Sequence, residues 1–244
     1  MNKGAGRVVT QNLPRIYQSI QNGLFFKNAQ LLEALIYAKM NRSRVHIMGL
    51  TSDGGAHSHI NHFLATIEFF AKNNLIEELF IHAFTDGRDS APDSAKLFLD
   101  QIQNHINTFG IGKIATLCGR SIAMDRNGQW DRTKKIYDLL TQNIGITASN
   151  YESALLRSYA SGLTDEFIQP TVLAPNSNIR SNDVVIFLNF RPDRALQLTQ
   201  SLIDNDFNHF PRVNLSPVFF ASMVEYRKDY PQKILFPKQY INVP

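Results

Sequence analysis

The chain has 244 residues, of which 43% are hydrophobic and 19% are charged, and its formal net charge is +4. This length allows one large hydrophobic core or two small ones, and the composition is that of a globular protein, not of a disordered one. No apolar run reaches the roughly 18 residues of a membrane span, and the first residues lack the apolar core of a secretory signal. We therefore expect a cytoplasmic protein with no membrane partner. The lone Cys118 excludes an internal disulfide and a cysteine-based zinc cluster.

The positive net charge favours anionic partners in general. Nucleic acid is one such partner, but the basic residues are scattered along the sequence. They do not alternate with aromatic residues in a way that is typical of a base-stacking surface. We therefore expect no nucleic-acid partner.

Apolar periodicity predicts strands that alternate with helices along most of the chain. In chain order we expect a strand at 45–50, a helix with its apolar face from Ile60 to Ala71, a strand at 79–84, a loop at 85–93, a helix from Ala95 to Ile106, a strand at 113–118, a loop at 119–128, a helix from Trp130 to Leu140, a strand at 183–188 and a helix that begins near Pro192. Buried strands separated by helices favour a mainly parallel sheet covered on both faces. The predicted fold class is α/β, a three-layer α/β/α sandwich.

Two regions are less informative. Residues 144–160 and 162–181 indicate a helix followed by an irregular connection, because Pro170, Pro175 and an Asn-rich stretch interrupt the pattern. Residues 236–244 are apolar and extended, and the sequence shows no partner for them.

Polar residues gather in the loops that follow the predicted strands. Ligands of α/β sheets bind at the loops that leave the carboxyl ends of the strands. The stretches 52–59, 85–89, 119–126 and 189–194 all lie in such loops. Their convergence predicts a ligand site at one edge of the sheet.

Arg191 and Arg194 are three residues apart at a predicted helix start, so both guanidinium groups can lie beside the positive end of the helix. Arginine suits phosphate and carboxylate because its planar fork donates two hydrogen bonds at once. The alternative is that Asp193 forms an ordinary surface salt bridge with one of them.

Three further arginines follow other strands. Arg88 and Asp89 lie in Asp86-Gly-Arg-Asp89, a pattern that alone is typical of a simple turn. Arg120 and Arg126 lie in the next loop, and each alone could be a solvated surface charge. Together, five arginines at consecutive strand ends predict a pocket for a small, multiply charged anion.

The stretch Gly49-Leu-Thr-Ser-Asp-Gly-Gly-Ala-His-Ser-His-Ile-Asn-His-Phe63 carries three histidines. His57 and His59 form a His-x-His pair, which suggests a zinc amidohydrolase as an alternative. However, the pair follows two glycines and opens a helix, and the sequence offers no matching set of further ligands. His59 and His62 fit polar surface or capping positions better. We favour a tight turn at Gly54 and Gly55 that points His57 at the ligand.

At these residues the chain resembles the cofactor-independent (2,3-bisphosphoglycerate-independent) phosphoglycerate mutases. The matching motifs are Leu50-Thr-Ser-Asp-Gly-Gly-Ala-His-Ser-His59, His82-Ala-Phe-Thr-Asp-Gly-Arg-Asp89, Gly119-Arg120 with Ala123-Met-Asp-Arg126, Trp130-Asp-Arg132, Asp165-Glu-Phe-Ile-Gln-Pro170 and Asn189-Phe-Arg-Pro-Asp-Arg194. They occur in order over nearly the whole chain. One departure is Ser121-Ile122, where the family usually carries aromatic residues.

The resemblance implies an isomerase of glycolysis and gluconeogenesis that interconverts 3-phosphoglycerate and 2-phosphoglycerate through a phosphorylated serine beside two manganese ions. It also implies that the substrate is contacted by His57, Arg88, Asp89, Arg120, Arg126, Arg191 and Arg194. Asp89 would handle protons at the glycerate hydroxyls.

The resemblance covers one of the family's two domains. It implies that residues 13–235 form the substrate-binding domain and that residues 1–12 and 236–244 connect it to a phosphatase domain, which would carry the serine and the metal ligands. We therefore expect the chain alone to lack mutase activity and a manganese site. A stand-alone anion-binding module is the other hypothesis, of a different class.

Overall fold

The structure is a computed structural model that describes residues 7–9, 11–75, 77–213, 215–238 and 240–242. Its centre is an eight-stranded sheet with the spatial order β5 (Ile146–Thr147), β6 (Thr171–Val172), β4 (Lys113–Gly119), β3 (Leu79–Thr85), β2 (Val45–Leu50), β7 (Val184–Phe187), β8 (Phe219–Ser222) and β9 (Lys233–Ile234). Within this sheet β6 runs antiparallel to β4, and the other neighbouring pairs are parallel. The mainly parallel sheet confirms the predicted class.

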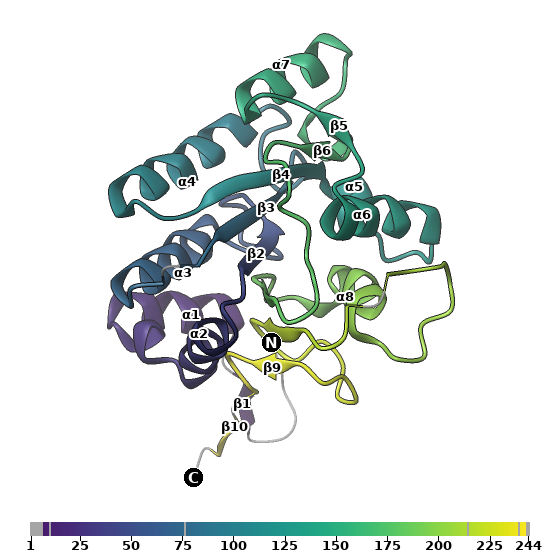
Figure 1. Ribbon diagram of the computed structural model, residues 1–244. Helices are drawn as coiled ribbons and strands as arrows, with labels where there is room; N and C mark the ends of the chain where they lie inside the picture. The colour runs from purple at the N-terminus through teal and green to yellow at the C-terminus, as the bar shows by residue number, and fades with distance from the viewer. Residues whose placement is uncertain (1–6, 10, 76, 214, 239, 243–244) are drawn as a thin grey trace.

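Helices cover both faces of the sheet (Figure 1). One side carries α1 (Asn12–Gln21), α2 (Ala29–Asn41), α3 (Ile60–Lys72) and α4 (Ala95–Phe109), and the other carries α5 (Arg120–Ala123), α6 (Trp130–Gln142) and α8 (Leu196–Ile203), while α7 (Tyr151–Ala160) packs beside α4. Short 3-10 turns are η1 (Leu24–Lys27), η2 (Asp165–Phe167) and η3 (Pro192–Arg194). This is the expected three-layer arrangement. None of the helices in the described ranges is long and apolar enough to cross a bilayer.

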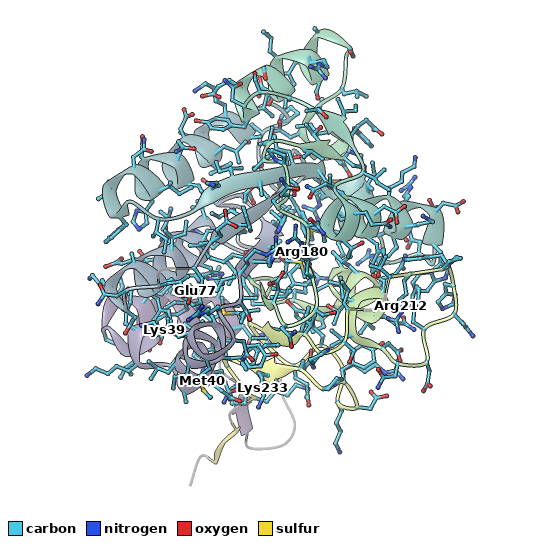
Figure 2. All side chains as sticks on the ribbon, in the orientation of Figure 1. Lys39, Met40, Glu77, Arg180, Arg212 and Lys233 are labelled. Atoms are coloured by element: carbon cyan, nitrogen blue, oxygen red, sulfur yellow. The ribbon has the colours of Figure 1, made fainter. Side chains whose placement is uncertain are left out.

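The central strands are buried along their length. Every residue of β2 and of β3 is buried, which agrees with their continuous apolar sequences and with helices on both faces. Figure 2 shows side chains that fill the space between the sheet and the helices on both sides, while the labelled Lys39 and Met40 lie at the outer end of α2. The Met40 side chain is 80% exposed there.

A chain of polar side chains crosses the buried sheet. His46 Nδ1 lies 2.9 Å from His82 Nε2, and His46 Nε2 lies 3.1 Å from Asp183 Oδ2. The other ring nitrogen of His82, Nδ1, is 2.9 Å from Thr116 Oγ1. Arg44 pairs with Asp183 at 2.7 Å and is the last member of this row of side chains. Hydrogen bonds thus compensate the burial of these polar groups.

Several expected boundaries were wrong. The predicted loop at 119–128 contains the short helix α5, because Ile122 and Ala123 bury apolar side chains there. Pro192 opens a 3-10 turn and not an α-helix, and α8 begins only at Leu196. Strand β8 was not expected, although all of its residues are buried.

The two ends of the chain form a separate ribbon. Strand β1 (Arg7–Val9) pairs antiparallel with β10 (Tyr240–Asn242), so residues 240–242 of the stretch without an expected partner do have one. The sequence could not reveal this pairing, because the two strands are more than 200 residues apart. The connectors expected at 1–12 and 236–244 fall partly on residues 1–6, 10, 239, 243 and 244, which lie outside the described part of the chain.

Candidate functional site

The four polar loops follow four strands that are neighbours in the sheet. Strands β4, β3, β2 and β7 stand in this order, and all three pairings between them are parallel. Their carboxyl ends therefore meet at one edge, as in other α/β sheets that bind ligands there. The expected convergence of residues 52–59, 85–89, 119–126 and 189–194 is confirmed as geometry.

Asp86 is the buried anchor of the site. Its Oδ1 accepts hydrogen bonds from Arg120 Nη1 at 2.6 Å and from the backbone N–H groups of Arg88 and Asp89, and its Oδ2 accepts from the Ser52 hydroxyl at 2.6 Å. One carboxylate thereby joins the loops after β2, β3 and β4. The turn pattern of Asp-Gly-Arg-Asp suggested a local role only, so sequence reasoning missed Asp86 and Ser52.

Arg120 is held between two carboxylates. Its Nη1 donates to Asp89 Oδ2 at 2.5 Å as well as to Asp86. Burial opposes the charge of Arg120, but the hydrogen bonds to Asp89 and Asp86 outweigh it and raise the pKa of this guanidinium. Burial likewise acts to raise the pKa of Asp86, and the bonds from Ser52, the Asp89 backbone and Arg120 outweigh it and lower that pKa. Both groups are charged at neutral pH.

Asp193 forms ion pairs with two arginines, separately from the group formed by Arg120, Asp86 and Asp89. Arg126 Nη1 donates to Asp193 Oδ2 at 2.5 Å, and Arg191 Nε lies 2.9 Å from Asp193 Oδ1. The surface salt bridge considered as an alternative therefore exists, between Asp193 and Arg191, and Arg126 from the loop after β4 joins it. Burial would raise the pKa of Asp193, but the Arg126 hydrogen bond and the charge of Arg191 lower it. Arg126 and Arg191 keep 43% and 52% of their side-chain surface exposed, so solvent reaches both.

His57 lies between the Arg120 group and the Asp193 group. Its Nδ1 is 3.8 Å from Asp193 Oδ1, and the residue is 4% exposed. This nitrogen has no hydrogen-bond partner within the described residues. Burial first, and then the positive charge of Arg120, lower the pKa of His57 to about 4. The ring is therefore neutral at pH 7 and can exchange hydrogen bonds with a ligand without carrying charge.

Arg194 shows that the arginines share one region. Its Nη1 donates to the Met124 carbonyl at 3.2 Å, on the loop after β4. Burial lowers the pKa of Arg194, and the charges of Arg126, Arg120 and Arg88 lower it further. Arg126 and Arg191, which come from the loops after β4 and β7, share the carboxylate of Asp193, so these loops bring their arginines close together. A region in which arginines outnumber aspartates favours an anion.

Arg88 lies at the rim of this region. Its side chain is 56% exposed, and its Nη1 is 3.5 Å from Glu166 Oε1, on η2. Sequence reasoning did not single out Glu166 as a partner, although it falls within the Asp165–Pro170 motif. The inner part of the site is thus buried and already paired, whereas the outer arginines are accessible.

The glycine pair before His57 has two separate functions. Gly55 has φ +64°, a backbone conformation that other residues rarely adopt. Gly54 lies against the neighbouring loop, where an added Cβ would be 2.7 Å from the Asp89 carbonyl oxygen. The backbone bends at residues 52–53 and 56–57, on either side of the glycine pair, and Gly54 lets the loop after β2 lie against Asp89.

The other two histidines, His59 and His62, make contacts of their own. His59 Nδ1 accepts from the Asn61 N–H at 3.2 Å and caps α3, as expected for a capping residue. His62 is 1% exposed, so a surface position was wrong for it, because the ring of Phe190 covers it at a centroid distance of 5.7 Å. No group of three or more His, Cys, Asp or Glu side chains gathers within the described ranges. These residues do not fit a zinc or a manganese centre.

The fold and this geometry define an α/β domain with a cluster of arginines at the carboxyl edge of its sheet. Residues 16–228 match the family described as BPG-independent PGAM N-terminus (iPGM_N). Among curated proteins, the chain is 46% identical over 230 residues to the 2,3-bisphosphoglycerate-independent phosphoglycerate mutase of Clostridium novyi and 44% identical over 247 residues to that of Symbiobacterium thermophilum. These alignments cover 93% and 100% of this chain.

A solved structure agrees. Phosphoglycerate mutase of Leishmania mexicana, crystallised at low cobalt concentration, superposes with a TM-score of 0.88 and 28% identity over 96% of this chain. The chain belongs to the family of 2,3-bisphosphoglycerate-independent phosphoglycerate mutases and matches its N-terminal part. It spans about half the length of these relatives, covering 45% and 48% of the two curated proteins and 45% of the Leishmania chain.

Proposed function

We propose that this chain is the substrate-binding domain of a cytoplasmic phosphoglycerate mutase and that it holds 3-phosphoglycerate and 2-phosphoglycerate at the arginine-lined edge of its sheet. Residues 13–235 form the domain, and residues 1–12 and 236–244 are its connections to a phosphatase domain. The observation that carries the proposal is geometric: Arg126, from the loop after β4, and Arg191, from the loop after β7, share the carboxylate of Asp193, whose Oδ1 lies 3.8 Å from His57 Nδ1.

Each side chain has a role that follows from its position. The exposed guanidinium groups of Arg88, Arg126 and Arg191 exchange their present carboxylate partners, Glu166 and Asp193, for carboxylate and phosphoryl oxygens of the substrate, to which arginine donates bidentate hydrogen bonds. Arg194, which is half-buried, adds positive charge beside Met124. The neutral ring of His57 offers Nδ1 to a hydroxyl or phosphoryl group.

Asp89 is the proposed proton acceptor and donor at the glycerate hydroxyls. Its side chain is 30% exposed, and its Oδ2 is held by Arg120 Nη1 at 2.5 Å, which fixes the carboxylate at the rim. A general base must lie within hydrogen-bond reach of the proton that it takes. The second oxygen, Oδ1, remains for that contact.

Cleavage of the phosphate ester belongs to the part of the relatives that this chain does not match. There we place the serine nucleophile and two manganese ions, which supply a nucleophile and charge neutralisation for phosphoryl transfer. This domain contributes the positioning of the sugar acid, which is itself a large share of such catalysis.

Isothermal titration calorimetry of the 244-residue chain with 3-phosphoglycerate tests the proposal. We expect weak binding that Arg191→Ala reduces at least about tenfold, the loss of a charged bidentate hydrogen bond. Arg157→Ala is the matched control, because Arg157 lies on α7 and donates to the Thr147 carbonyl. Equal binding by both variants would contradict the proposed site.

A stand-alone anion-binding module is the second candidate, and the accessible outer arginines favour it. Inorganic phosphate and citrate distinguish the two. A module without substrate specificity should bind these anions as tightly as 3-phosphoglycerate. A mutase domain should prefer the sugar acid, because His57 and Asp89 are placed to contact its hydroxyls.

A further inference from the structure

The first turn of α1 contacts two of the loops that form the candidate site. Asn12 Nδ2 donates to the Phe190 carbonyl at 3.2 Å, immediately before Arg191. Leu13 packs on the loop after β2, where its Cδ2 lies 3.0 Å from the position that a Cβ on Gly55 would take. One helical turn therefore contacts the loop that carries His57 and the loop that carries the arginines.

The same turn also meets the chain that leads into the terminal ribbon. Arg15 Nη1 donates to the Pro237 carbonyl at 2.6 Å, and its guanidinium lies 5.4 Å from the centroid of the Phe236 ring. Strand β10 begins shortly afterwards, and β1 ends just before α1. The ribbon and the site are thus connected through residues 12–15.

Phe190 is held from three directions. Its N–H donates to the His57 carbonyl at 2.8 Å, its carbonyl accepts from Asn12, and its ring packs edge-on against buried His62. Arg191 follows directly, with extended backbone dihedrals of −116° and 120°. The direction in which Arg191 leaves the sheet therefore depends on how Phe190 is fixed.

We propose that Asn12 is a positioning residue for substrate binding, acting through Phe190 on Arg191, and that it transmits the orientation of the β1–β10 ribbon to the anion site. This inference rests on the proposed function. A hydrogen bond to the carbonyl of Phe190 restricts rotation of the following peptide, so the guanidinium of Arg191 is already oriented when the anion arrives. Preorganisation of this kind increases affinity by lowering the entropic cost of binding.

The test is a double-mutant cycle on the 244-residue chain, with 3-phosphoglycerate binding as the readout. Asn12→Ala removes the Nδ2 donor without adding charge. We expect it to weaken binding about fivefold to tenfold, which is what one net hydrogen bond contributes. In an Arg191→Ala background the same substitution should change binding by less than about twofold, because residues that act through one another are not additive. An equal loss in both backgrounds would overturn the proposal.

Asn12→Asp separates positioning from folding. An aspartate in the first turn of a helix is favourable, and α1 has no acidic residue there. We expect the melting temperature to stay the same or rise while binding falls, a combination that a merely structural role for Asn12 would not produce. Gln11→Asp is the control for added charge, because Gln11 directly precedes α1 and its side chain makes no capping hydrogen bond. If Gln11→Asp weakens binding as much as Asn12→Asp, the effect is electrostatic and the proposal fails.

Amide hydrogen exchange of the ligand-free protein keeps the two hypotheses distinguishable. Asn12→Ala should speed exchange in residues 190–194 at least about threefold and leave that of β3 unchanged, as expected for local opening. If the wild-type chain does not bind 3-phosphoglycerate but exchange rises as described, the proposed function fails and the positioning role of Asn12 stands. Unchanged exchange at 190–194 would overturn that role.

Discussion

Arg120 Nη1 lies 2.6 Å from Asp86 Oδ1, and the two side chains are 3% and 1% exposed. A buried charge that loses its partner is costly, because neither water nor another group can replace it. Asp86 also accepts the Ser52 hydroxyl and two backbone N–H groups, so the pair joins three loops.

We expect Asp86→Ala to lower the free energy of unfolding by about 3 kcal/mol, the usual effect of breaking a buried pair. Urea denaturation measures it. Glu68→Ala is the control, because Glu68 pairs with Lys72 on the exposed side of α3, where such pairs contribute less than about 1 kcal/mol. A similar decrease in the free energy of unfolding in the two variants would show that the buried pair contributes no more to stability than the pair on α3.

Asp193 competes with the ligand for two arginines. Its carboxylate already engages Arg126 and Arg191, so an entering anion must displace it. We expect Asp193→Asn to tighten 3-phosphoglycerate binding about threefold to tenfold, since a repelling charge is removed from a partly buried site. Asp229→Asn, which disturbs an exposed pair with Arg227, should leave the affinity unchanged. Weaker binding by Asp193→Asn would mean instead that this carboxylate orients the arginines.

Buried histidines should make the protein sensitive to acid. Burial lowers the pKa of His62 to about 3, and burial with the charge of Arg120 lowers that of His57 to about 4. The unfolded chain takes up these protons nearer the ordinary histidine pKa of about 6.5. The free energy of unfolding is therefore highest above about pH 6.5 and falls as the pH drops toward 4.

His62→Leu should make this dependence shallower by about 1 kcal/mol per pH unit between about pH 6 and pH 4.5. Urea denaturation across this range measures it. His46 and His82 also have their pKa values lowered, chiefly by burial, and remain in both proteins. Their contribution cancels in the comparison. Identical slopes would show that the ring of His62 does not titrate with folding.

Substitution of Gly54 should weaken ligand binding. A Cβ at this position would lie 2.7 Å from the Asp89 carbonyl, so Gly54→Ala must shift the loop that carries Asp89 and Arg88. We expect at least about tenfold weaker 3-phosphoglycerate binding, since small displacements in a site are costly. Gly110→Ala is the control, because Gly110 ends α4 with φ +68° in open space. It should cost about 1 kcal/mol of stability and no affinity.

The sequence predicted the edge of the sheet at which the site lies but not the pairing within the site. Buried strands and polar loops follow one another with clear periodicity, so the loops after β2, β3, β4 and β7 could be placed at one edge. The role of Asp86 could not be predicted, because a turn aspartate and a buried anchor look alike in sequence. Similarly, the burial of His62 depends on Phe190, which comes from a distant segment of the chain.

The pairing of strands that are far apart in the chain could not be predicted from the sequence either. Strand β8 has only four residues, and a short apolar run does not reveal its neighbour. The pairing of β1 with β10 depends on the whole domain bringing its two ends together.

The polar chain across the sheet has a direction. Asp183 can only accept when ionised, and although burial acts to raise its pKa, the bonds from His46 and Arg44 keep that pKa low. His46 must then donate from Nε2 and accept at Nδ1, His82 must do the same, and Thr116 must donate its hydroxyl hydrogen. Both imidazoles are therefore fixed as the same neutral tautomer, with the proton on Nε2. The negative charge of Asp183, directly before β7, thus determines the position of each hydrogen-bonding proton from β7 to Thr116 on β4.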